Sequence, residues 1–342
     1  MNKFNSMLAV AFIAVAFTAC KKDSEPVVVV PPSDGSTLTL EGKTTVSPYA
    51  NIVFADFSKD KQAAVDRKSW NIGLTSDSRF RVILNASYQT TAVATTKTDI
   101  NAVTLADPGT TKNLNHDITD PLTVSLVDSW DGDITKTVFA EVSATEASNL
   151  VYLVSFEGSK DKDKWVKVKI SRNGNGYRIQ HARLGETTIK TLDVAKNADF
   201  NLAFVSLENN KTLTVEPAKA DWDLSWSYST YNSGLGSPYW FQDYVTINDL
   251  AGTQAAEVLT STVSYADFSE TNVAGLTYLS TRDAIGSKWR TTTGAGIKTD
   301  RFYVVKDSAG NVYKLKFVSM GVGSDGGERG KPVIEYKLIK QG

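Results

Sequence analysis

The sequence predicts an all-β protein with few short helices, and three observations support this prediction. Segments such as Val166–Ile170 and Tyr313–Phe317 alternate apolar and charged residues with the two-residue period of a half-buried strand. Turn-forming residues separate such segments, as Asn173–Gly176 does after the first of these two. Helical patterns are few and short, and Phe139–Asn149 and Ser264–Thr271 are the best of them.

Further strands are predicted along most of the chain. Phe302–Val305 and Val312–Phe317 are separated by Asp307–Asn311, a spacing typical of a hairpin. Four more candidate strands are Thr123–Val127, Phe200–Leu207, Leu213–Val215 and Tyr244–Ile247.

Matching residues recur in the same order in the two halves of the chain, which predicts an internal duplication. The matches are Phe57, Lys61 and Val65 with Leu207, Lys211 and Val215, Trp70–Ile72 with Trp222–Leu224, and Tyr152–Val154 with Tyr303–Val305. We therefore expect two related β domains, at residues 37–192 and 197–342. Their middle segments, 75–148 and 227–300, diverge, and variable segments on a shared frame are where binding specificity is expected.

The composition argues against several classes of function. The chain has 342 residues with 37 Lys and Arg against 38 Asp and Glu, and this balance argues against a general nucleic-acid binder. One cysteine excludes a disulfide framework and a cysteine zinc site. The two histidines, His116 and His181, leave little for metal clusters or general bases. The sequence is therefore poor in catalytic groups.

The N-terminus has the pattern of an export signal. Lys3 precedes the apolar run Met7–Phe17, and small residues then lead to Cys20, the single cysteine. We predict a signal peptide at residues 1–19 and a lipobox in which Cys20 is acylated. The alternative is a plain signal peptide followed by an incidental cysteine. Residues 20–36 are polar and contain three prolines, so we expect them to be a lipid anchor and tether.

These features together resemble a known family. Phe204–Trp226, which contains Val215-Glu216-Pro217 and Trp222-Asp223-Leu224, resembles the strand, hairpin and Trp-Asp strand of HmuY-like haemophore lipoproteins of the Bacteroidota type. Phe302–Lys340 resembles the closing strands of that family, and the lipobox and the charged stretch Lys21–Glu25 agree with it.

The resemblance implies a function and a location. It implies two HmuY-like domains in a lipoprotein anchored in the outer membrane, at the cell surface of a Gram-negative bacterium. Such a protein binds haem, captures it and hands it over to a partner. It catalyses no reaction. The expected partners are the membrane through the lipid anchor, the small-molecule ligand and an outer-membrane transporter, with no nucleic acid.

The sequence departs from the family at the haem ligands. The founding members hold iron through paired histidines, but residues 227–300 contain no histidine and no methionine. Tyrosine is the iron-binding residue type that this middle segment offers. In the other middle segment His116 is a weak candidate for a haem ligand, and the alternative is a solvated loop histidine.

The segment Trp226–Tyr244 is the strongest local signal for a binding site. Seven of its 19 residues are aromatic, and Gly234, Gly236 and Pro238 predict that part of it is loop. Exposed rings on such a loop can stack on a porphyrin or a sugar. The predicted ligand contacts are Tyr228, Tyr231, Tyr239 and Trp240. The alternative is that these rings are buried as a satellite core.

Other candidates have simpler explanations. We expect His181 to face the interior of a strand framework and Met320 to be a core residue. Asp128–Asp133 has carboxylate spacing that could touch calcium, without the closing glutamate of an EF-hand.

We therefore predict a binding protein rather than an enzyme. The leading function is capture of haem or a related tetrapyrrole, and the alternative is a non-haem glycan- or protein-binding module. A carboxylate-dependent glycosidase is the enzyme class that stays open, because it needs only two acidic residues.

Overall fold

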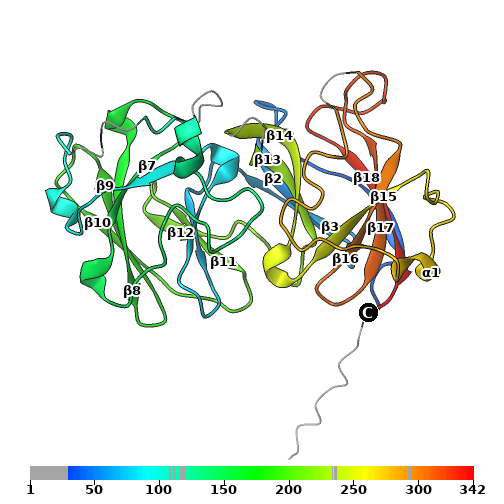
Figure 1. Cartoon of the computed structure of the whole chain (residues 1–342), viewed down its shortest axis with the longest axis horizontal. Helices are drawn as coiled ribbons and strands as arrows, with labels where there is room; N and C mark the ends of the chain where they lie inside the picture. Colours follow the sequence, from blue (N-terminus) through cyan, green and yellow to red (C-terminus); the bar gives the residue numbers. More distant parts are fainter. Residues whose placement is uncertain are drawn as a thin grey trace, which may run out of the picture. The chain divides into compact units, whose positions relative to one another are not determined.

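Four antiparallel β-sheets form the computed structural model (Figure 1), which describes residues 30–342 apart from 108–109, 111–112, 116–120, 233, 235–236 and 292–293. Sheet I contains β6 (Thr91–Ala94), β7 (Val151–Ser155), β8 (Val166–Asn173), β9 (Gly176–Arg183) and β10 (Lys190–Val194). Sheet II contains β4 (Ile72–Thr75), β5 (Val82–Leu84), β11 (Leu202–Ser206) and β12 (Lys211–Leu213).

The other two sheets contain the remaining strands. Sheet III contains β2 (Asn51–Asp56), β3 (Lys61–Asp66), β13 (Leu224–Asn232) and β14 (Pro238–Ile247). Sheet IV contains β1 (Gly35–Thr39), β15 (Gln254–Leu259), β16 (Arg301–Lys306), β17 (Val312–Ser319) and β18 (Val333–Lys340). The all-β prediction is thus confirmed.

Helical structure is sparse in the described part of the chain. It holds one α-helix, α1 (Glu270–Val273), and short 3₁₀ turns. These turns are η1 (Ala86–Tyr88), η2 (Ile100–Ala102), η4 (Pro121–Leu126), η5 (Glu146–Ser148), η6 (Lys162–Lys164) and η7 (Asp249–Ala251). The predicted helix at Phe139–Asn149 is reduced to η5, and the one at Ser264–Thr271 overlaps only the start of α1. No helix within the described ranges is long and apolar enough to cross a membrane.

Two predicted strands are wrong or misplaced. Leu213–Val215 shares only Leu213 with β12, which ends there. Thr123–Val127 lies mostly in η4 instead. Thr123 and Leu126 are buried while Leu122 and Val124 are exposed, which is a three-residue period rather than the two-residue period of a strand. Pro121 also suits the first position of a helical turn, because its missing N–H would have no partner there.

Three apolar clusters pack the sheets in the order I, II, III, IV. Ile72 and Val205 of sheet II pack with Val168 of sheet I, and Val53 of sheet III packs with Tyr313 of sheet IV. The cluster between sheets II and III consists of Ile52, Phe54, Trp70, Leu202, Phe204, Val215 and Trp222.

Sheets II and III each combine strands from both halves of the chain. The early hairpin β2–β3 pairs with the late strand β13, with Ala55 opposite Leu224. The late hairpin β11–β12 pairs with the early strand β4, with Val205 opposite Ile72. We call these two arrangements the first and the second crossing. Because of the crossings, residues 32–342 form one compact unit, and the division into domains at 192–197 stays a prediction.

The predicted signal peptide and Cys20 lie outside the described residues, as does most of the tether. Where the described chain begins, Ser33 N–H donates to the Ser58 carbonyl over 2.8 Å, and β1 then pairs with β18. The tether therefore joins the fold beside the β2–β3 turn.

Candidate functional site

The predicted aromatic site is a β-hairpin. Strands β13 and β14 pair over most of the segment, with Thr230 opposite Trp240 and Tyr231 opposite Tyr239. The pairing is irregular between Ser227 and Ser229, so one strand bulges there. The loop that the glycines predict is confined to the tip of the hairpin. Because neighbouring residues of a strand point to opposite faces, Tyr239 and Trp240 belong to different surfaces.

Tyr228 and Trp240 are packed against each other. Their rings stack with centroids 3.8 Å apart and planes 9° apart, and the Arg67 guanidinium lies 5.0 Å from the Tyr228 ring. The Trp240 indole N–H donates to the Ala86 carbonyl over 2.9 Å. Tyr49 covers Tyr228 edge-on at 5.2 Å. One face of each stacked ring is therefore occupied by the other ring, which matches the satellite-core alternative for this pair.

Tyr231 and Tyr239 lie on the other surface of the hairpin. Both are half-buried, as Tyr228 and Trp240 are, and both contact Phe241, at centroid distances of 5.6 and 5.2 Å. Tyr231 also meets Tyr244 edge-on at 5.8 Å. The Arg290 guanidinium lies 4.2 Å from the Phe241 ring. This pair presents ring surface near the tip of the hairpin, so it fits the predicted ligand contacts better than Tyr228 and Trp240 do.

A buried carboxylate holds the base of the hairpin. The Tyr49 hydroxyl and the Arg329 Nη2 donate to Asp243 Oδ2 over 3.1 and 3.0 Å. Asp243 has a left-handed backbone, with φ +54°. Burial raises the pKa of Asp243 to about 7, although Arg290 acts to lower it. The bonds of Asp243 Oδ2 to Tyr49 and Arg329 make this cluster a structural support for the hairpin.

The two middle segments of the chain meet at this hairpin. Turn η4 contacts β14 as well as β6. Leu122 and Val124 of η4 are exposed apolar residues, with 71% and 39% of their surface accessible. A turn of the first middle segment that carries exposed apolar residues therefore contacts strand β14 of the aromatic hairpin. His116, the weak haem-ligand candidate of the first middle segment, lies outside the described residues.

His181 and Met320 are structural residues. The His181 Nε2 shares a hydrogen bond of 2.8 Å with Asn210 Oδ1 in the β11–β12 turn, and burial lowers the pKa of His181. Met320 is fully buried in the cluster between sheets III and IV.

The carboxylates of Asp128–Asp133 are used by the protein itself. Asp128 accepts from the Leu84 and Val138 N–H groups over 2.6 and 2.8 Å, and Asp131 accepts from Ser129 Oγ over 2.6 Å. No group of three metal-binding side chains occurs among the residues that the structure describes.

The described residues do not supply the paired histidines of the founding haem binders. The one described histidine is His181, which is buried against Asn210. With Met320 in the core, the half-buried tyrosines Tyr228, Tyr231 and Tyr239 are the side chains of iron-binding type that the hairpin offers.

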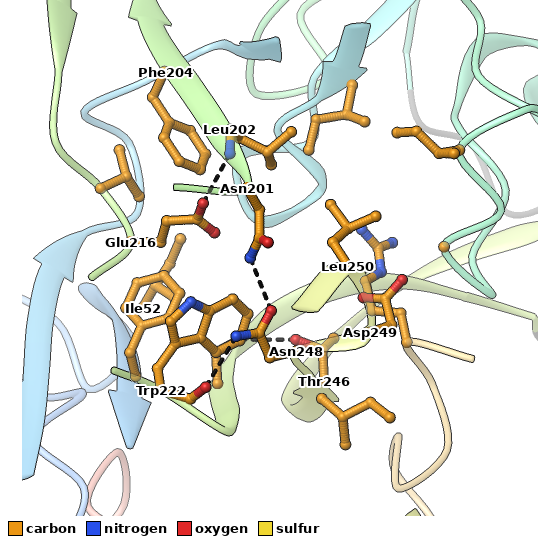
Figure 2. Close-up of a pocket in the computed structure, with 18 of the residues that line it drawn as sticks. Ile52, Asn201, Leu202, Phe204, Glu216, Trp222, Thr246, Asn248, Asp249 and Leu250 are labelled. Carbon is orange, nitrogen blue, oxygen red and sulfur yellow. Dashed lines mark hydrogen bonds between the residues drawn. The ribbon is translucent and has the colours of Figure 1, made fainter. Parts of the chain in front are cut away.

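A central cavity between sheets II and III is a second candidate site, which the sequence analysis missed (Figure 2). It has a volume of about 130 Å³, and its apolar wall is the cluster between these two sheets. Trp70 and Trp222 both line the cavity. These tryptophans are a matched pair in the repeat, and that match was the available signal.

The polar groups at the cavity are mostly bonded to each other. Figure 2 shows Glu216 accepting from the Leu202 N–H and the Asn201 amide donating to Asn248, over 2.9 and 2.8 Å. Asn248 in turn donates to the Trp222 carbonyl over 2.9 Å. Burial raises the pKa of Glu216 to about 7 and that of Asp249 to about 6.

The protein is all-β and carries a cluster of aromatic residues at one hairpin. Comparison with known families identifies the family to which such a protein belongs. The family model described as "HmuY protein" matches residues 48–336. The chain therefore belongs to the HmuY family, and the resemblance seen in the sequence is confirmed.

One solved structure is similar to this chain. It is a putative HmuY_like heme binding protein from Bacteroides vulgatus ATCC 8482, with 10% identity, and the match covers 90% of this chain and 93% of that one. The TM-score is 0.21, which is too low to carry a structural argument. No curated protein matches the sequence.

Proposed function

We propose that this protein is a surface lipoprotein that captures haem or a related tetrapyrrole for hand-over and catalyses no reaction. Membership of the HmuY family supports haem binding at the level of the family. The observation that carries the proposal for this chain is the contact of η4 with β14. It joins exposed Leu122 and Val124 to the end of the molecule that holds Tyr231 and Tyr239.

This end offers what a flat apolar ligand needs. Aromatic faces bind planar rings by offset or edge contacts, and exposed aliphatic side chains add apolar area. Tyr231 and Tyr239 also carry hydroxyls of a type that can bind haem iron. Such a site binds and orients its ligand, and nothing in it requires a chemical step.

The point at which the tether joins the fold supports a surface role. Along β13 the chain runs from Leu224, opposite Ala55, away from the β2–β3 turn where Ser33 is bonded. The eight further residues to Asn232 span about 26 Å at the usual rise of a strand. The attachment point of the tether is therefore at the opposite end of sheet III from the aromatic hairpin tip, which leaves the tip accessible to ligand and transporter.

We also propose that the two halves arose by internal duplication. The two crossings pair equivalent residues, since Leu224 opposite Ala55 corresponds to Ile72 opposite Val205. Equivalent hydrogen bonds of Asp223 and Asn71 accompany the two crossings.

A hemin titration tests the proposed function. The protein should give a saturable, shifted Soret band, and no spectral change in either oxidation state would end the proposal. Tyr231→Phe and Tyr239→Phe should alter or abolish the band if one of them binds iron, and His116→Ala tests the remaining candidate. Tyr228→Phe is the matched control, because Tyr228 is stacked on Trp240 and should leave the band unchanged.

A non-haem glycan- or protein-binding module is the second candidate function. The observation that favours it is that the described residues provide no paired histidines. Saturable quenching of tryptophan fluorescence by a glycan, with no response to hemin, would support it. Hydrolysis of that glycan, lost on a single Asp or Glu substitution, would instead show an enzyme.

A further inference from the structure

The central cavity has hydrogen-bond donors without acceptors. The Nε1 atoms of Trp70 and Trp222 and the Nε of Arg282 are buried and have no partner among the described residues. All three side chains line the cavity. A buried N–H that finds no acceptor costs about 1–3 kcal/mol of stability, so three of them around one space call for an explanation.

The two tryptophans are held in the same way from opposite sides. The Trp222 ring meets Phe54 edge-to-face at 5.1 Å, and the Trp70 ring meets Phe204 edge-to-face at 4.8 Å. In each pair the phenylalanine belongs to a hairpin, β2–β3 or β11–β12. The tryptophan directly precedes the strand with which that hairpin pairs, β13 or β4. Phenylalanine at either tryptophan position would serve this packing without a stranded N–H. The indole nitrogens therefore have no evident role in holding the sheets together.

The hydrogen bonding of Trp70 and Trp222 can be compared with that of other tryptophans in the chain. The indoles of Trp165 and Trp240 donate to carbonyls over 2.8 and 2.9 Å. Trp226 and Trp289 also lack an acceptor within the described structure, but they are packed in the core between sheets III and IV. Trp70 and Trp222 differ from both groups because space for a ligand adjoins them.

The charges around the cavity restrict the ligand. Arg282 is the cation at the cavity, and it lies close enough to Asp249 and Asp128 to oppose the rise in pKa that burial causes in both carboxyls. Glu216 also lines the cavity. The surroundings therefore do not favour an anion, while the free donors favour an acceptor oxygen.

The volume of the cavity limits the size of the ligand. A cavity of about 130 Å³ is close to the roughly 150 Å³ engineered cavity that holds a benzene molecule. It is below the usual range of about 300–1,000 Å³ for larger ligands, so a tetrapyrrole does not fit.

We propose that the central cavity binds a small, uncharged carbonyl compound about the size of one six-membered ring. The apolar wall receives its ring, and its oxygen accepts from one or two of the N–H groups of Trp70, Trp222 and Arg282. Neither Tyr231 nor Tyr239 lines this cavity, and the proposal does not depend on haem binding.

The test uses cyclohexanone as the probe and toluene as a ring of similar size without an acceptor. In the protein labelled with ¹⁵N-tryptophan, cyclohexanone should shift the indole N–H resonances of Trp70 and Trp222 and leave that of Trp165 in place. It should bind about tenfold tighter than toluene, because one to two net hydrogen bonds are gained. Benzoate should bind more weakly than cyclohexanone.

The variant Trp70→Phe/Trp222→Phe keeps the aromatic packing and removes two donors. It should still bind toluene, and its preference for cyclohexanone should fall to within about threefold. The proposal is overturned if neither indole resonance moves at saturating probe, if toluene binds as tightly as cyclohexanone, or if the double variant keeps the tenfold preference. Indole N–H groups that contact only water in the presence of cyclohexanone would overturn it as well. A hemin titration of the same variant separates this result from the proposed function, since the hairpin end is untouched.

Discussion

The first and second crossings dock their hairpins through corresponding contacts. In the first, the Asp223 N–H donates to the Ala55 carbonyl and Asp223 Oδ2 accepts from the Phe57 N–H, over 2.8 and 2.7 Å. In the second, Asn71 makes the same two bonds at the same distances, to Val205 and through Oδ1 to Leu207. The two edge-to-face Phe–Trp pairs add a further correspondence. One arrangement thus holds both hairpins.

The crossings differ in the groups that can titrate. The first uses the carboxyl of Asp223 where the second uses the amide of Asn71. At the hairpin turns, Asp60 accepts from the Tyr336 hydroxyl over 2.6 Å, whereas Asn210 is bonded to His181. Equivalent positions therefore keep their hydrogen-bond geometry while their charge changes. Both crossings therefore require the same hydrogen-bond geometry. Their stability can nevertheless respond differently to pH, because only one of them uses a carboxyl group.

Separating the two halves should have the largest effect. Residues 32–196 and 197–342 expressed alone should each fail to fold cooperatively, because β4 and β13 would lose their hairpin partners. Co-expressed, the two pieces should assemble into a stable complex with the circular dichroism and thermal transition of the intact chain. A half that unfolds cooperatively on its own would show that the crossing is not required.

Truncating the two phenylalanines compares the crossings directly. Phe54 and Phe204 are both at least nine-tenths buried, so Phe54→Ala and Phe204→Ala should each lower the free energy of unfolding by about 3–5 kcal/mol. The two losses should agree within about 1 kcal/mol in urea titrations. Leu variants at both positions are the milder controls. A large loss at one position only would mean that the crossings are not energetically equivalent.

Asp223→Asn should remove a pH dependence. Burial, the largest cause, raises the pKa of Asp223 to about 8, against about 4 in an unfolded chain. Between these values the folded protein holds a proton that the unfolded chain has lost. This contribution is complete below about pH 4 and is lost as the pH rises towards 8. The Asn variant should therefore exceed the original in stability at pH 8, on the order of 5 kcal/mol.

The reciprocal change is the control for this prediction. Asn71→Asp should bring a similar decline with rising pH into the second crossing, measured by urea unfolding between pH 4 and 8. Equal slopes for Asp223→Asn and the original chain would contradict the assignment.

Substitutions at the hairpin turns should have the smallest effect. Asp60 and Asn210 both have left-handed backbones, with φ +51° and +49°. Alanine at either position should cost about 1–2 kcal/mol through backbone strain and the lost side-chain bond. Glycine keeps the backbone free, so Asp60→Gly and Asn210→Gly should cost less than the alanine variants in the same unfolding measurement. If glycine is the worse residue, the left-handed backbone is not the source of the cost.

Local patterns in the sequence predicted most strands and few of their partners. The alternation in Val166–Ile170 and Tyr313–Phe317 recurs in β8 and β17 because a strand with one buried face needs that period. The crossings could not be predicted this way. Since the two halves match around the hairpins, no local pattern in β2–β3 indicates whether it pairs with β4 or with β13.

The candidate site was predicted in part for a similar reason. The richness of Trp226–Tyr244 in aromatic residues located the hairpin, but not which rings stay open. That depends on Arg67 and Tyr49, which come from elsewhere in the chain and cover Tyr228. The central cavity depends on the meeting of two distant tryptophans, and each alone is indistinguishable from a core residue.

The pairing of β1 with β18 has a consequence for biogenesis. The first strand of the fold finds its neighbour only in the last strand to be made, with Gly35 opposite Lys337. Contacts so distant along the chain close late and slowly. A polypeptide that is synthesised from its N-terminus therefore leaves β1 without its neighbour until β18 has been made.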